Sequence, residues 1–215
     1  EDVLRALEAR GTAPAPQPSR LPFGGMRQAI AEQMVYSLTT MAQVSMSTTA
    51  DVTELKSTRE ALSARRGFKP SYTDLLVKAV AVALQEHPLL GARLEGDEIA
   101  LPAETNVGVA VALEGGLIVP VVRHADRLTL REIGNRLKDL AERARQNALA
   151  VEEVSGGTIT ITNLGTYGID AFTPIINPPE VAILGVGRIT PHLALVEGQV
   201  IAREVMTLSL TVDHR

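Results

Sequence analysis

The chain contains no cysteine and no tryptophan, and only 3% of its 215 residues are aromatic. Without cysteine, a disulfide framework, a thiolate zinc site and a cysteine nucleophile are all excluded, so any thiol in its chemistry must come from a substrate. No apolar run approaches the ~20 residues that span a bilayer, and no signal-peptide pattern opens the chain. We therefore expect no membrane contact and a cytoplasmic location.

The chain also has no excess of basic residues, because its net charge is −4. This charge argues against a nucleic-acid partner. What the chain does have is 45% hydrophobic residues, mainly Val, Leu, Ile and Ala, and 21% charged residues. This composition is typical of a globular protein. Its length suffices for one large domain or two small ones.

Proline divides the chain near its start. Residues 1–10 form a short amphipathic pattern, and residues 11–22 carry four prolines among small polar residues. Such an Ala/Pro segment is typical of a semi-rigid extended linker. We therefore predict the end of a separate small module at 1–10, a linker at 11–22 and the main domain at 23–215.

Helical periodicity occurs in four segments of the main domain. Helices are predicted at Met26–Met41, about Asp51 to Arg66, Thr73–Glu86 and Thr129–Asn147. Capping-box spacing marks three starts, at Asp51/Glu54, Ser71/Asp74 and Thr129/Glu132. The third helix is apolar on most sides, so we expect it to be central and buried.

Alternating or continuous apolar runs predict the strands. They are expected at Gln43–Thr49, a buried hairpin of Asn106–Leu113 and Leu117–Val122, Gly157–Asn163, Val181–Ile189, a hairpin of Leu193–Val196 and Val200–Glu204, and Thr207–His214. The order of elements favours an α+β fold, in which helices pack on one side of a mixed β-sheet.

The last nine residues are TLSLTVDHR, and the strand predicted there ends on the histidine, His214. His214 shares the phase of Leu208, Leu210 and Val212, so the alternation predicts that it points inward. A histidine held at the end of a strand suits acid–base chemistry, because its ordinary pKa lies near neutrality. On spacing alone, a structural or surface role is the commoner explanation for such a residue.

Five segments occur in an order that resembles the catalytic domain of dihydrolipoamide acyltransferases, the core components of 2-oxo acid dehydrogenase complexes. These segments are MRQAIAEQM from Met26, GLIVPVVRHAD from Gly116, GGTITITNLGTYG from Gly156, FTPIINPPEVAILGVGRI from Phe172 and SLTVDHR from Ser209. The resemblance implies a chloramphenicol acetyltransferase-like fold. It also implies that residues 1–10 are the remnant of a peripheral subunit-binding domain.

The resemblance implies that the chain moves an acyl group between the thiols of dihydrolipoamide and coenzyme A. His214 then matches the general base and Thr162 the hydroxyl that stabilises the oxyanion. Arg27, Ser71, Thr129 and Asn163 lie where the family contacts coenzyme A. Helix capping explains Ser71 and Thr129 equally well, a turn explains Asn163 and a solvated helix face explains Arg27. Thr162 alone would be taken for an ordinary strand residue.

The resemblance also implies an assembly. Family members form trimers in which His214 of one subunit would meet Thr162 of the next, and the trimers build cubic or dodecahedral cores. The lipoyl group sits on an upstream domain that this chain lacks. The dehydrogenase and dihydrolipoamide dehydrogenase components are the expected partners, through the upstream binding domain. No metal is implied.

One departure concerns the end of the motif. The family pattern continues past DHR to an aspartate-glycine pair and a C-terminal helix, so we expect a catalytic domain without its C-terminal tail, whose active site is incomplete as written. Whether the tail was removed or never encoded, and whether this form is active, stay open. Two alternatives stay open. One is a non-catalytic core or binding component of such a complex, and the other is a free-standing acetyltransferase of the chloramphenicol type.

Overall fold

The computed structural model of the chain describes residue 20 and residues 22–215. The predicted module at 1–10 and nearly all of the linker at 11–22 lie outside the described residues. The helices of the described part are α2 (Met26–Thr40), α3 (Thr53–Arg66), α4 (Tyr72–Glu86) and α5 (Leu130–Arg145). Short 3-10 turns follow at η1 (Pro88–Gly91), η2 (Val151–Val154) and η3 (Gly165–Tyr167). No helix in this part of the chain is long and apolar enough to cross a membrane.

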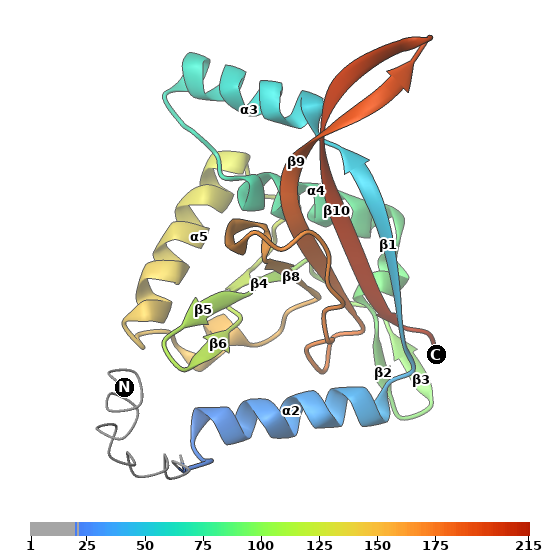
Figure 1. Cartoon of the computed structure of the whole chain (residues 1–215). Coiled ribbons are helices and arrows are strands. Elements are labelled where there is room, and N and C mark those ends of the chain that lie inside the picture. The colour runs from blue at the N-terminus through green and yellow to red at the C-terminus, as the bar shows by residue number, and fades with distance from the viewer. Residues whose placement is uncertain (1–19, 21) are drawn as a thin grey trace, which may run out of the picture.

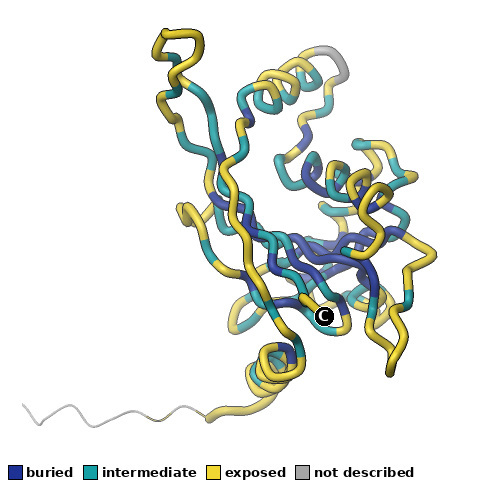
Figure 2. Tube along the Cα trace, turned by 90° about the vertical axis from the view of Figure 1, so that its right-hand side faces the viewer, coloured by how far each residue is buried: buried dark blue, intermediate teal, exposed yellow. Residues whose placement is uncertain are grey.

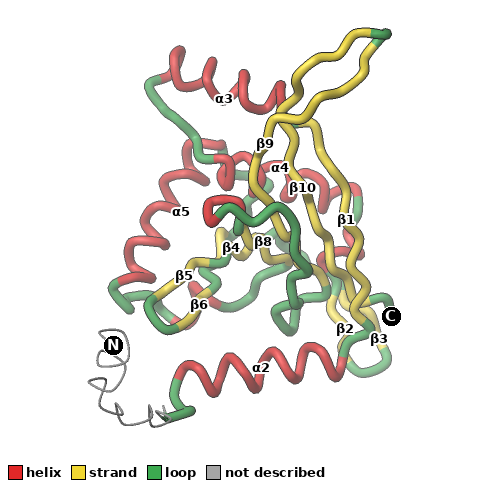
Figure 3. Tube along the Cα trace, viewed as in Figure 1, coloured by secondary structure: helices red, strands yellow, loops and turns green. Residues whose placement is uncertain are grey.

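A six-stranded mixed sheet forms the centre of the molecule (Figures 1 and 3). Its order is β1 (Gln43–Asp51), β10 (Gln199–Asp213), β9 (Ala182–Val196), β8 (Ile159–Asn163), β4 (Val107–Val109) and β7 (Val121–Val122). β8 runs parallel to β4 and β9, whereas the other pairs are antiparallel. Two small sheets pair β2 (Arg93–Glu95) with β3 (Glu98–Ala100) and β5 (Val111–Leu113) with β6 (Gly116–Ile118).

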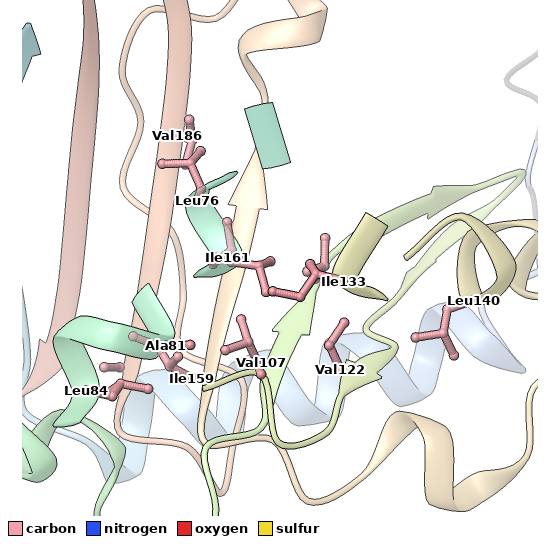
Figure 4. Packing of buried hydrophobic residues seen from close by; sticks show 14 of the residues in the cluster. Leu76, Ala81, Leu84, Val107, Val122, Ile133, Leu140, Ile159, Ile161 and Val186 are labelled. Carbon is pink, nitrogen blue, oxygen red and sulfur yellow. The ribbon is translucent and has the colours of Figure 1, made fainter. Parts of the chain in front are cut away.

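The core lies between this sheet and helices α4 and α5. Val77 of α4 and Ile133 of α5 are fully buried, as are Val107 and Ile161 of the sheet, and Figure 4 shows the cluster they belong to. Because such side chains are shielded from water, each contributes about 1.5–3 kcal/mol of hydrophobic free energy. Figure 2 shows that burial is concentrated at the centre of the sheet, whereas α2 is mostly exposed. The predicted α+β class, with helices on one side of a mixed sheet, is confirmed.

Two strand predictions need correction. The expected hairpin of Asn106–Leu113 and Leu117–Val122 exists but is split near Pro120, so its outer half, β5 with β6, forms a separate and partly exposed sheet. The four strands expected between residues 181 and 214 are two long ones, because β9 and β10 continue through the predicted breaks to a turn at Gly198. The tip of this hairpin projects beyond the rest of the molecule (Figure 1).

Two helix predictions also need correction. Asp51 does not cap α3, because it is still paired with Val205 in the sheet and its carboxylate accepts a hydrogen bond from the Thr53 amide at 2.9 Å instead. α4 is not buried on most sides, since Val82 on its outer face is 49% exposed. The capping boxes at Ser71 and Thr129 are both formed.

The segment after β8 packs backbone against backbone on β9. The amide of Arg188 donates to the carbonyl of Ile169 at 2.8 Å. A Cβ atom on Gly187 would overlap the carbonyl oxygen of Asp170, and one on Gly165 would lie 2.5 Å from the carbonyl oxygen of Gly187. Glycine is therefore required at both positions by the close approach of two backbones.

We expect Gly187→Ala to destabilise the protein by about 1–3 kcal/mol or more, because a backbone carbonyl cannot rotate away from the added methyl group. The matched control is Gly24→Ala, since a Cβ there meets no atom within 4 Å. Urea denaturation measures both. Equal midpoints for the two variants would show that the 164–171 segment is not held as described.

Candidate active site

His214 lies just beyond the end of β10. Its backbone amide donates to the carbonyl of Ala42 at 2.9 Å, and the amide of Asp213 donates to the carbonyl of Val181 at 2.8 Å. The prediction that His214 points inward is wrong, because the residue is exposed. Leu208, Leu210 and Val212, which share the phase of His214 along the strand, do pack against the core. The core does not extend as far as residue 214. The backbone of His214 is thus held firmly while its imidazole faces outward in this chain.

The residues on either side of His214 form an ion pair. The guanidinium group of Arg215 donates to the Asp213 carboxylate at 2.6 Å, and this carboxylate also accepts from the amide of Ala42 at 3.2 Å. The Asp213 side chain is only 4% exposed, and the Arg215 guanidinium holds its pKa below the usual value. In the alternation of the last strand, Asp213 falls on the polar face, opposite the phase of Leu208, Leu210 and Val212. Its side chain is instead buried, where it braces the turn that carries the histidine.

Thr162 lies near the end of β8 and is half-buried. It shares its phase with two earlier threonines whose hydroxyl groups are occupied. The Thr158 hydroxyl accepts from the amide of Asn106 at 3.0 Å, and the Thr160 hydroxyl donates to the Glu180 carboxyl group at 2.6 Å. Among the described residues, the Thr162 hydroxyl has no such partner, so it remains available to a ligand.

Thr162 and His214 cannot meet within one chain. Thr162 is paired with Gly185, and Gly185 is paired with Ser209, so His214 lies five residues further along β10 and two strands away. At ~3.3 Å per residue and ~4.8 Å per strand, the two residues are about 19 Å apart. A site that uses both groups therefore needs a second chain.

Three of the four predicted coenzyme A residues lie at one end of the sheet. The Asn163 side chain reaches the start of α4, where its amide donates to the Thr73 hydroxyl at 3.3 Å, and its carbonyl accepts from the amide of Gly165 at 3.0 Å. Ser71 caps α4 and Thr129 caps α5. The starts of these two helices lie together, since a Cβ on Gly134 of α5 would be 3.0 Å from the Asp74 carboxylate of α4.

The structure therefore shows Asn163 in its turn-forming role and Ser71 and Thr129 in their capping roles. The remaining residue, Arg27, lies on the exposed α2 and away from this end, because the neighbouring Met26 packs against Gly116 of β6. A cleft of about 180 Å³ opens beside Asn163, and its lining includes Tyr72. The described residues contain no cluster of His, Asp or Glu side chains that could hold a metal ion.

Sequence reasoning missed Glu180, a carboxyl group that is only 3% exposed. It accepts a hydrogen bond from Thr160 on the strand that carries Thr162. Burial raises its pKa to about 7, although the hydrogen bonds from Thr160 and Asn177 act in the opposite direction. The available signal was a glutamate directly before the apolar strand VAILGVG, a position at which a charge is unexpected.

The arrangement of the sheet and helices is that of the chloramphenicol acetyltransferase fold. A chloramphenicol acetyltransferase has the same fold, with a TM-score of 0.50 and 15% sequence identity over 85% of each chain. The more specific assignment comes from the sequence. The chain belongs to the family described as 2-oxoacid dehydrogenases acyltransferase (catalytic domain), whose profile matches residues 15–215.

Similar proteins support this assignment. The dihydrolipoyllysine-residue acetyltransferase component of the acetoin cleaving system of Bacillus subtilis (strain 168) is 39% identical over 225 residues, which cover 100% of this chain and 56% of that protein. A dihydrolipoamide acetyltransferase from Azotobacter vinelandii, in which the catalytic roles of a serine, a histidine and an asparagine were investigated, has a TM-score of 0.87 and 34% identity, covering 92% and 84%.

A further neighbour is the cubic core of a pyruvate dehydrogenase multienzyme complex, with the same TM-score of 0.87, 34% identity and coverage of 92% and 84%. The chain spans about half the length of the curated relatives that it matches. The family resemblance expected from the five sequence segments is confirmed.

We expect Asp213→Ala to loosen the turn that carries His214, because the change leaves the Ala42 amide and the Arg215 guanidinium without their acceptor. Amide hydrogen exchange at Ala42 and His214 should become at least about tenfold faster, since local opening then loses roughly 1–3 kcal/mol of hydrogen-bond energy. Asp97→Ala, in the exposed turn between β2 and β3, is the control. Unchanged protection in Asp213→Ala would mean that the ion pair does not brace this turn.

Glu180 predicts an unusual dependence of stability on pH. Because its pKa is about 7 in the folded state and ordinarily 4.5, the folded state binds the extra proton between these values. Its contribution to stability is complete below pH 4.5 and is lost as the pH rises to about 7, by up to about 3 kcal/mol. Glu180→Gln should remove this decline. Parallel pH profiles of the unfolding free energy for the two proteins would contradict the assignment.

Proposed function

We propose that the chain transfers an acyl group between the thiol of a dihydrolipoyl group and the thiol of coenzyme A, as the catalytic domain of the core of a 2-oxo acid dehydrogenase complex. The observation that carries the proposal is the pair of available groups in a chain of this acyltransferase family: a histidine held at a strand end, and a threonine hydroxyl that has no partner within residues 22–215. The acetyltransferase names of its relatives favour acetyl as the acyl group.

The two groups divide the chemistry between them. His214 takes the proton from the attacking thiol, whose ordinary pKa of ~8.5 leaves only a few per cent as thiolate at neutral pH. The new carbon–sulfur bond forms as the carbonyl electron pair moves to oxygen, and the Thr162 hydroxyl donates a hydrogen bond to that oxyanion. When the oxyanion collapses, the other sulfur leaves and receives the proton from His214. No net charge or proton is consumed.

The separation of His214 and Thr162 within one chain supports an active site between subunits. In a homotrimer, three equivalent interfaces would each combine the histidine of one chain with the threonine of the next. The similarity to a cubic pyruvate dehydrogenase core supports assembly of such trimers into a larger core. Binding two carriers in one passage would hold their sulfur and carbonyl atoms in reacting geometry.

Coenzyme A is assigned to the end of the sheet where α4 and α5 begin. Two helix N-termini there direct partial positive charge outward, which favours an anionic ligand. Coenzyme A would be contacted by those hydrogen-bonding groups of Ser71, Thr129 and Asn163 that capping and turn formation leave unused. Arg27 would have to come from a neighbouring chain. The 180 Å³ cleft beside Asn163 is a candidate path for its flexible arm.

The remaining parts of the proposal concern the complete protein. Residues 1–10 and 11–22 would be the end of a subunit-binding domain and its linker, joined upstream to a lipoyl domain. The dehydrogenase and dihydrolipoamide dehydrogenase components would be its partners. The absence of a metal requirement and a cytoplasmic location remain predictions, as does an active site that is incomplete without the C-terminal tail.

Removing the oxyanion donor tests the chemistry. Thr162→Ala in the full-length protein should lower kcat by about 10²–10³-fold, as is typical for one lost donor, whereas Thr162→Ser should keep most of the activity. Acetyl transfer from acetyl coenzyme A to free dihydrolipoamide measures both. Thr48→Ala, on the exposed edge strand, is the control. Full activity in Thr162→Ala would refute the role of this hydroxyl group.

Mixing two inactive variants tests the shared site. His214→Ala and Thr162→Ala chains should each be inactive, but random co-assembly restores both groups at about one quarter of the interfaces of a trimer. Activity should therefore recover to about that fraction after the two are unfolded and reassembled together. No recovery despite mixed trimers, shown by native mass spectrometry, would exclude a site between subunits, and a wild-type protein without activity would favour a non-catalytic core component.

A further inference from the structure

Glu180 lies between the two parts of the chain that carry the proposed catalytic groups. On one side it accepts the hydrogen bond of Thr160, two residues before Thr162 on β8. On the other side its neighbour in the chain, Val181, accepts the hydrogen bond from the amide of Asp213, one residue before His214. The buried side chain of Glu180 therefore holds β8, and the backbone of the next residue, Val181, holds the end of β10.

The carboxyl group fits closely into its surroundings. Gly157 lies against it so tightly that a Cβ atom there would overlap the Oε1 atom of Glu180. The side chain of Asn177 lies beside it and favours its charged form, and the backbone amide of Glu180 donates to the carbonyl of Asn177 at 3.1 Å. Asn177 is itself held by Gln33 of α2, whose side-chain amide donates to it at 2.8 Å. The charged group that faces Glu180 is Arg93 of β2, whose guanidinium also donates to the carbonyl of Gly157 at 3.0 Å.

We infer that Glu180 is a positioning residue for the acyl transfer, because its buried carboxyl group ties the strand that carries Thr162 to the segment that anchors His214. The inference rests on the proposed function. Every chain would contribute its histidine to one site and its threonine to another. A shift between β8 and the end of β10 within the chain would thus misplace a group at two active sites, although Glu180 touches neither substrate.

The ionisation of Glu180 gives this role a signature. Below pH 7 the neutral carboxyl group is stable in its buried position, whereas above pH 7 the buried charge favours loosening of the contact with β8. The kcat of the wild-type protein should then fall above pH 7. Glu180→Gln keeps the shape and a hydrogen-bonding amide without the charge, so it should retain kcat within about twofold at pH 6.5 and lack the fall.

The experiment compares Glu180→Ala and Glu180→Gln with wild type in the assembled full-length protein. Glu152→Ala and Glu152→Gln, on the exposed turn η2, are the matched controls. Glu180→Ala should lower kcat by about tenfold or more with KM changed less than about twofold, because groups needed in the transition state are misplaced. The kcat of the Glu152 variants and their pH profiles should match those of wild type.

Hydrogen exchange provides a readout that does not depend on activity. In Glu180→Ala, the amides of Asp213 and Thr162 should exchange faster than in the Glu152 variants, with the trimer intact by light scattering. The inference is overturned if these amides keep wild-type protection, or if the pH profile of Glu180→Gln matches that of wild type. If the wild-type protein transfers no acyl group but the exchange prediction holds, the proposed function fails and the structural link stands.

Discussion

The antiparallel pairing of β9 with β10 is the interaction on which the placement of every proposed catalytic group depends. It runs from the turn at Gly198 to the pair of Val212 with Ala182 and joins the end of the chain to the centre of the sheet. Because strand residues alternate between faces, a slip of one position would exchange the buried and outward sets of side chains along the whole of β10. The same register carries His214 away from Thr162, and the need for a second chain follows from it.

Threonines on and next to β8 have two different roles, one structural and one proposed to be chemical. Thr158, directly before β8, shares its phase with Thr160 and Thr162, yet the first two hydroxyl groups are bonded within the chain, whereas the third has no partner among the described residues. The difference comes from position. The earlier threonines face buried polar groups, whereas Thr162 lies where the strand emerges from the core. The same side chain thus becomes available for chemistry only at the end of the strand.

Hydrogen bonds between polar side chains of the sheet help to fix how its strands are arranged relative to one another. The hydroxyl groups of Ser45 and Thr211 lie 2.7 Å apart across β1 and β10, and Glu180 joins Thr160 on the far side of β9. A buried polar group without a partner would cost about 1–3 kcal/mol, so each pair favours one arrangement of the strands over its alternatives. Precise placement of His214 and Thr162 requires this kind of specificity more than it requires additional hydrophobic area.

Local patterns determined the helices, most strands and the two capping boxes at Ser71 and Thr129, whereas the resemblance of five segments to a known family made Thr162 and His214 candidates. The local features depend on neighbours within a few residues, and the sequence displays such neighbours directly. Tertiary structure alone decided the outward direction of His214, the continuous strands of the long hairpin and the burial of Glu180 against Thr160. Each of these depends on contacts between residues far apart in the chain, such as Thr160 with Glu180, which no local periodicity encodes.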